Sequence, residues 1–155
     1  YPKTKSMKHV ASIAIVLLFT LIATTGYSQT ASKPKQFSNF PDVINCSETQ
    51  LSSIFNSTPG QNVNLAFSDN FSFSGDVVNN VVKYSNLQSA VIKSPAFHNS
   101  IFSISKITNK DNSISYVGRI VNKNYFDGYE LKKNAAGNYQ LIKMETDRVI
   151  QDCSQ

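Results

Sequence analysis

The chain has one mainly apolar stretch near its N-terminus and continues with short segments in which apolar and polar residues alternate. The apolar stretch covers residues 10–22 and follows Met7, Lys8 and His9. Its 13 residues suit the hydrophobic region of a secretory signal peptide and fall short of the roughly 20 that a membrane-spanning helix needs. We therefore expect a signal peptide over residues 7–28, cleaved before Gln29, with residues 1–6 as an upstream extension.

Export changes the charge of the chain and the partners that this charge suggests. The formal net charge is +5, and removal of residues 1–28, which hold three lysines and no acid, lowers it to +2. The remaining basic residues are spread singly among acids, a pattern that argues against a nucleic-acid partner. We expect a secreted or periplasmic protein with no membrane association once the signal peptide is removed.

The folded part is predicted to start after a polar leader. Residues 29–39 (QTASKPKQFSN) have no apolar periodicity, so we expect a flexible leader there and a single β-rich domain over residues 40–155. Ser47 and Gln50 have the spacing of a helix capping box. The apolar residues that follow recur on one helical face, which predicts a short helix over residues 47–56, ended by Pro59 and Gly60. These apolar residues are Leu51, Ile54 and Phe55.

From residue 62 onward, apolar residues recur at every second position, the period of half-buried strands. Short polar turns separate the segments and favour antiparallel neighbours, because a parallel pair needs a crossover of about a dozen residues. Gly75 and Gly118 are expected at bulges or close backbone approaches, and Gly137 at a turn with positive φ. The pattern predicts an α+β, mainly β fold. In it, an antiparallel sheet of about six to eight strands, as a meander or a small barrel or sandwich, carries the short N-terminal helix. The expected strands cover residues 62–68, 71–77, 81–84, 87–93 (or one bent strand over the last two), 101–107, 113–121, 129–133 and 139–144.

The two cysteines suggest a disulfide bond. Cys46 precedes the predicted helix and Cys153 lies near the end of the sequence. An even number of cysteines in an exported chain favours a Cys46–Cys153 bridge, which would close a long loop and hold the helix against the last strand. The alternative is that Cys153 is a free thiol, for example one that ligates the catalytic metal of an enzyme that the protein inhibits.

Residues with catalytic or metal-binding chemistry are few. His98 is the one histidine that follows the predicted signal peptide, and no Gly-x-Ser-x-Gly motif accompanies it, so a small hydrolase that uses His98 is the least favoured hypothesis. One histidine and two cysteines that are expected to be oxidised to a disulfide cannot supply the three or four ligands of a zinc site. We therefore expect no enzyme activity, no metal and no cofactor.

Acidic residues occur close together at two places, and a third segment offers other oxygen ligands. Asp127 with Glu130, and Glu145 with Asp147, would have to flank a cleft to hydrolyse a glycosidic bond, and positions on hairpins do not ensure this. Cross-strand charge pairs are the simpler interpretation. The turn over residues 109–112 offers oxygen ligands but a single carboxylate, which favours a hydrogen-bonded turn over a calcium site.

One segment has the composition of a recognition surface. Arg119, Tyr125, Phe126 and Asp127 lie in a short stretch, and arginine and aromatic residues anchor protein partners when they are exposed. We therefore expect a non-enzymatic binding or structural module whose partner is another secreted or cell-surface protein. The alternative is a regulatory domain of a secreted hydrolase, resembling a propeptide or an inhibitor. The oligomeric state is left open.

Overall fold

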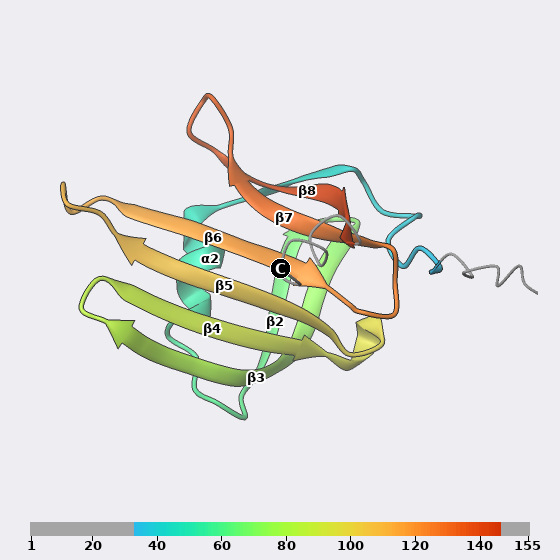
Figure 1. The fold of residues 1–155 in the computed structure, drawn as a ribbon, viewed down its shortest axis with the longest axis horizontal. Coiled ribbons are helices and arrows are strands. Elements are labelled where there is room, and N and C mark those ends of the chain that lie inside the picture. Colours follow the sequence, from blue (N-terminus) through green and yellow to red (C-terminus); the bar gives the residue numbers. More distant parts are fainter. Residues whose placement is uncertain (1–32, 147–155) are drawn as a thin grey trace, which may run out of the picture. The chain divides into compact units, whose positions relative to one another are not determined.

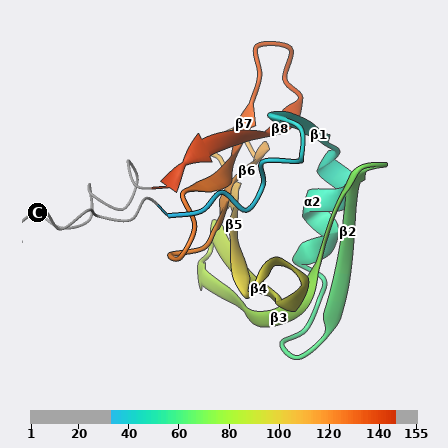
Figure 2. The same ribbon diagram turned by 90° about the vertical axis from the view of Figure 1, so that its right-hand side faces the viewer.

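The computed structural model describes residues 33–146. Eight strands form one antiparallel sheet in the order β1-β8-β7-β6-β5-β4-β3-β2, which curls into a nearly closed barrel around one helix (Figures 1 and 2). The elements are β1 (Val43–Cys46), α2 (Glu48–Ile54), β2 (Asn62–Ser68), β3 (Phe71–Tyr84), β4 (Leu87–Ser94), the 3-10 helix η1 (Pro95–Phe97), β5 (Ser100–Thr108), β6 (Ile114–Val121), β7 (Asp127–Lys133) and β8 (Tyr139–Glu145).

The predicted fold class is confirmed. The strand that the sequence pattern did not predict is β1. From β2 to β8, each strand pairs with the next along the chain, as in a meander. The first strand, β1, pairs with the last, with Val43 opposite Ile142 and Cys46 opposite Tyr139. Alternation over the four residues of β1 was too short to mark a strand.

The helix forms where its capping box predicted it. The Ser47 hydroxyl accepts a hydrogen bond from the Gln50 amide (3.1 Å), and the Gln50 side chain accepts one from the Ser47 amide (2.8 Å). Leu51 and Ile54 on the inner face of α2 are fully buried. Figure 2 shows α2 inside the curl beside β2, where the Gln50 amide group donates to the Ala66 carbonyl.

The second and third predicted strands, over residues 71–77 and 81–84, are one strand, β3, which runs through Asn79 and Asn80 with a bulge between Val77 and Asn79. The chain turns at Ser85 and Asn86 into β4. Residues 81–84 and 87–93 are therefore parts of two strands joined by a hairpin, and the alternative of one bent strand is wrong.

Both strand glycines lie where a neighbouring backbone approaches closely. A Cβ at Gly118 would lie 2.7 Å from the Ser103 carbonyl oxygen, and one at Gly75 would collide with the Lys93 carbonyl. The second of the two predicted reasons for these glycines, close approach, is therefore confirmed. Gly137 has the expected positive φ, 87°.

The core is aromatic at one end of the barrel, and the N-terminal segment contributes to it. Phe37 has no exposed surface, and its ring lies 5.1–6.2 Å from the rings of Phe40, Phe71, Phe97 and Tyr129. Residues 33–42, called the arm below, thus belong to the domain, and the expectation of a flexible leader is not met for residues 33–39. The rest of that leader and the predicted signal peptide lie outside the described residues.

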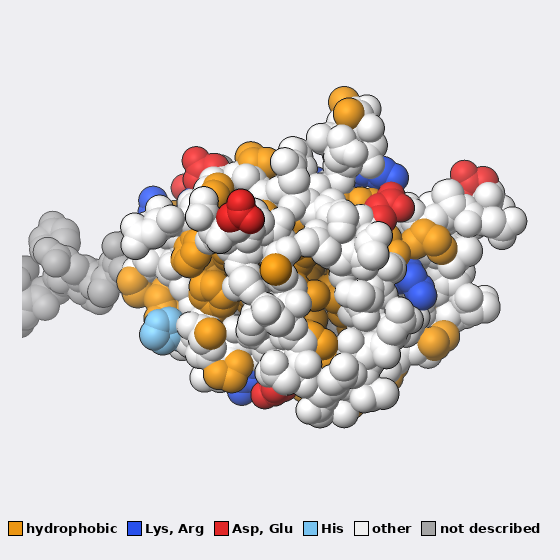
Figure 3. Space-filling view, turned by 180° about the vertical axis from the view of Figure 1, so that it is seen from behind, with side chains coloured by type: hydrophobic (Ala, Val, Ile, Leu, Met, Phe, Trp, Pro, Cys, Tyr) orange, Lys and Arg blue, Asp and Glu red, His pale blue; other side chains and the backbone are white. Residues whose placement is uncertain are grey.

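The face that carries β1, α2 and β2 is shown in Figure 3. Hydrophobic side chains gather in the middle of this face, and basic and acidic side chains are scattered singly around them. Among residues 33–146, no helix has the length and apolar character needed to cross a membrane.

Candidate binding groove

One buried carboxylate anchors the arm across the end of the barrel. Asp127, at the start of β7, is 3% exposed, and its two oxygens accept hydrogen bonds from the backbone amides of Gln36 (2.5 Å) and Phe37 (2.9 Å). The adjacent Phe126 amide donates to the Pro34 carbonyl at 2.9 Å. The start of β7 therefore fixes the path of the arm.

Side-chain hydrogen bonds fix the arm at two further points. The Tyr129 hydroxyl donates to the Pro41 carbonyl (2.7 Å), and burial raises the pKa of this phenol. The Gln36 side chain donates to the Phe97 carbonyl (2.6 Å) and accepts from the Ser100 hydroxyl (2.7 Å). Every one of these bonds joins the arm to residues at least 61 positions away.

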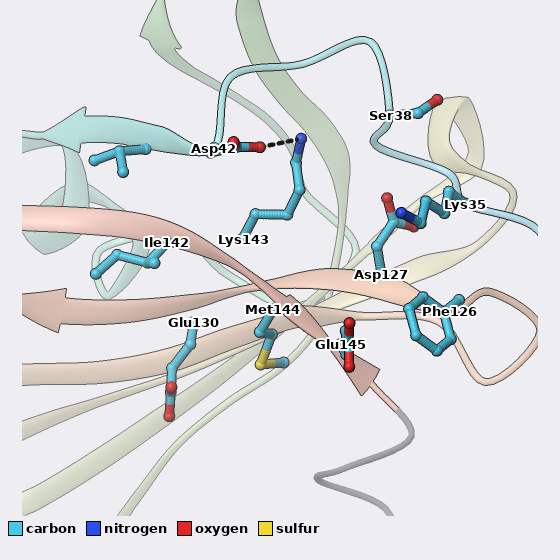
Figure 4. A pocket seen from close by; sticks show the side chains of 11 residues that line it. Lys35, Ser38, Asp42, Phe126, Asp127, Glu130, Ile142, Lys143, Met144 and Glu145 are labelled. Carbon is cyan, nitrogen blue, oxygen red and sulfur yellow. Dashed lines mark ion pairs between the residues drawn. The ribbon is translucent and has the colours of Figure 1, made fainter.

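Between the arm and the outer face of the sheet lies an open groove of about 740 Å³, called the arm groove below (Figure 4). Apolar side chains from β1 and β8 line it: Val43, its register partner Ile142, and Met144 two residues further along β8. Phe126 lines one end, and Lys35, Ser38 and Asp42 of the arm form a wall. The groove thus joins an apolar floor to a polar rim.

The arm wall is held to β8 by an ion pair. The Lys143 ammonium lies 2.8 Å from the Asp42 carboxylate and donates to the Phe40 carbonyl at 2.7 Å. The hydrogen bond from Lys143, with the charge of the same group, lowers the pKa of Asp42. Lys143 is mostly buried whereas Asp42 is largely exposed, so Asp42 presents a carboxylate to solvent at the rim.

The opposite rim carries a second charged cluster. Glu130 on the outer face of β7 lies 2.8 Å from Lys132 and 3.2 Å from Arg119 of β6. Its hydrogen bonds to Lys132 and Arg119 lower the pKa of Glu130. In total, four carboxylates and two lysines line the arm groove, so its formal charge is −2.

The structure separates the predicted recognition residues. Phe126 and Asp127 reach the groove, but the Asp127 carboxylate is occupied by the arm and cannot bind a partner at the same time. Arg119 lies on the outer face in its ion pair with Glu130, and Tyr125 is half-buried outside the groove lining. No sequence pattern indicates the arm wall, because the path of the arm depends on contacts with β7 and β8.

The Asp127 and Glu130 carboxylates do not form a catalytic pair. Asp127 faces inward to the arm, whereas Glu130 lies on the outer face and engages two cations. The second predicted pair includes Asp147, which lies outside the described residues. Cross-strand pairing, as between Glu130 and Arg119, is the role that the geometry supports.

His98 lies in a tight loop after η1. Its backbone has φ of 50°, its carbonyl accepts a hydrogen bond from Asn122 (3.0 Å), and its ring lies 5.6 Å from that of Tyr125. Within residues 33–146, no hydroxyl or carboxylate is hydrogen-bonded to this ring and no cluster of three metal-ligating side chains occurs.

In the 109–112 turn, the Asp111 carboxylate accepts from the Ser113 amide and hydroxyl (3.0 and 2.6 Å), as in a hydrogen-bonded turn.

Cys46 is a free, buried thiol that lies 3.7 Å from the Ile44 carbonyl. Burial raises its pKa to about 12. Cys153 lies outside the described residues, so the bridge stays a prediction.

Comparisons of the chain with protein-family models, with curated proteins and with solved structures found no match in any of the three.

Proposed function

We propose that this protein is an exported, non-enzymatic binding domain that holds a short segment of another secreted or cell-surface protein in the arm groove. The observation that carries the proposal is the groove itself, with its apolar floor of Val43, Ile142 and Met144 beneath a rim of net negative charge. Apolar pockets with a few placed polar groups are the usual form of ligand sites.

The chemistry of the rim indicates what kind of segment would bind. An apolar side chain that covers the floor would gain the free energy of burying Ile142 and Met144, both half-exposed. A neighbouring lysine or arginine would meet the exposed Asp42 carboxylate and the other acids of the rim. The preferred partner is therefore a segment with one or two apolar residues next to a basic one.

The arrangement of the reactive side chains favours binding over catalysis. The arm engages the Asp127 carboxylate and two cations engage the Glu130 carboxylate, and among residues 33–146 neither carboxylate is hydrogen-bonded to His98. A general base must lie within reach of the proton it abstracts and of a group that orients it. A hydrolase that uses His98 therefore has less support than a binding domain.

Selection from a displayed library of random peptides tests this function. We expect enriched peptides to carry an apolar residue beside lysine or arginine, and their binding to weaken with added salt. Met144→Lys places a cation on the groove floor and should weaken binding about tenfold or more. Val117→Lys is the matched control, since Val117 is an exposed valine on the outer face of β6 away from the arm groove.

Two outcomes would contradict the proposal: no peptide enriched above a blank surface, or enriched peptides whose binding Met144→Lys leaves unchanged. Circular dichroism of both variants checks that the sheet is intact. A secreted hydrolase identified as the natural owner of the enriched segment would place the protein with the regulatory domains, the alternative function. Export itself is tested by N-terminal sequencing of the secreted protein, which we expect to begin at Gln29.

A further inference from the structure

Half of β3 has an edge that no strand covers within residues 33–146. β2 pairs with β3 only as far as Asn62 opposite Asp76, and residues 60 and 61 extend these hydrogen bonds to Val77. From Val78 to Tyr84, called the free edge below, β3 pairs with β4 on one side alone. Unpaired backbone amides and carbonyls along such an edge are a template for another strand.

The free edge is also the most apolar exposed segment of the described chain. Val78, Val81, Val82 and Tyr84 are 57%, 40%, 69% and 68% exposed. They make up half of the eight large hydrophobic side chains that are exposed in residues 33–146. Contiguous exposed apolar residues on a soluble domain mark an interaction surface.

We infer that the free edge pairs with the same edge of a second copy of this chain, in a two-fold symmetric dimer with Val81 on the axis. The seven residues of the free edge are centred on Val81, so antiparallel pairing about that residue uses the whole unpaired length and nothing else. A self-complementary patch is what a two-fold interface requires.

The alternation of side chains selects this register. Residues directly opposite each other in an antiparallel pair point to the same face of the sheet. Asn80 points into the curl, where it donates to the Phe55 and Ser57 carbonyls, so Asn79 and Val81 point outward. Pairing about Val81 sets Asn79 opposite Lys83 of the second copy, and Val78 opposite Tyr84. The symmetric sequence Val-Val-Asn-Asn-Val-Val (residues 77–82) suggests another register, but that one would set outward Asn79 against inward Asn80.

Charge does not oppose the pairing. Lys83 is the one charged residue of the free edge, and a lone edge lysine commonly blocks strand addition. In the proposed register, Lys83 of one copy lies opposite the uncharged Asn79 of the second copy. The two copies of Lys83 are then four residues apart along the pair, about 13 Å, which exceeds the Debye length of about 8–10 Å. A second copy therefore meets no like charge directly opposite it.

Cysteine cross-linking tests the register. In a Cys153→Ser background, Val81→Cys would bring two thiol-bearing residues opposite each other, with Cα atoms about 4.5–5.5 Å apart, within the range that disulfides span. We expect a covalent dimer on a non-reducing gel after mild oxidation of the exported protein. Val117→Cys, a cysteine of similar exposure on β6, is the matched control and should stay monomeric. Equal cross-linking of the two variants would overturn the proposal.

Sedimentation of the exported protein tests the association without any cysteine. We expect dimers at about 100 µM or below, and Val81→Lys should weaken dimerisation about tenfold or more because it sets two ammonium groups directly opposite each other. Val117→Lys should leave the dimer unchanged. A monomer at all concentrations, or a dimer that tolerates Val81→Lys, would refute this interface. Neither result bears on peptide binding, because the arm groove lies on β1, β8 and β7 at the other end of the sheet order.

Discussion

The position of Phe37 provides the sharpest test of the arm as part of the fold. Its ring is completely buried against four other aromatic rings, although the polar sequence around it indicated a flexible leader. Phe37→Ala removes the ring and leaves a cavity that the surrounding β3, β7 and η1 side chains cannot fill without moving.

The expected loss follows from the burial. Truncation of a fully buried phenylalanine costs about 3–5 kcal/mol, and total stability amounts to about 0.05–0.15 kcal/mol per residue. For the 114 residues from 33 to 146, that total is about 6–17 kcal/mol. We therefore expect Phe37→Ala to remove between about a fifth and four fifths of the stability and to lower Tm by about 10–20 °C.

Guanidinium denaturation followed by circular dichroism measures this loss, with tyrosine fluorescence as a second probe because the chain has no tryptophan. Phe126→Ala is the control. It makes the same chemical change at a half-buried ring next to the arm and should cost about 1 kcal/mol. If the midpoint of Phe37→Ala moved no more than that of Phe126→Ala, the packing of the arm described above would be refuted.

Three further predictions concern single side chains. Ser47→Ala removes the helix cap and should cost about 1 kcal/mol, whereas the exposed Ser53→Ala should shift the denaturation midpoint little. Asp127→Asn replaces one acceptor oxygen by a donor and should cost about 2–3 kcal/mol. Hydrogen exchange of the arm amides should become faster, and unchanged protection would contradict the anchoring role. In the protein kept reduced, Cys46 is a thiol whose pKa burial raises from 9.0 to about 12. The stability that this buried neutral thiol contributes is therefore complete below pH 9 and is lost as the pH rises toward 12. The lost stability is about 4 kcal/mol, and urea midpoints from pH 8 to 12 should fall less in Cys46→Ala than in the natural protein.

Local rules predicted the elements whose causes are local. The cap of α2 depends on Ser47 and Gln50, which are three residues apart, and alternation of apolar residues located β2 and β5 to β8 because each has one face in the core. The glycine at position 118 was recognisable because a side chain inside a strand has little room where two backbones approach.

The features that the sequence pattern did not predict depend on contacts between distant residues. One phenylalanine in a polar segment carries no period, and the Phe37 backbone is anchored by Asp127, 90 residues later, while its ring packs on aromatic residues of distant elements. Because this contact is invisible in the sequence, Asp127 was predicted to bind a partner, whereas its carboxylate accepts hydrogen bonds from the arm. The floor of the arm groove was equally hidden, since Val43 and Ile142 become neighbours only when β1 joins β8.

The pairing of the first strand with the last also governs when the domain can form during synthesis. Val43 has no strand partner until Ile142 has been synthesised. β1 and the arm can therefore take their places only after nearly the whole domain has left the ribosome. At about 5–20 residues per second, this interval lasts several seconds. The export predicted from the sequence would therefore act on a chain whose sheet has not yet closed.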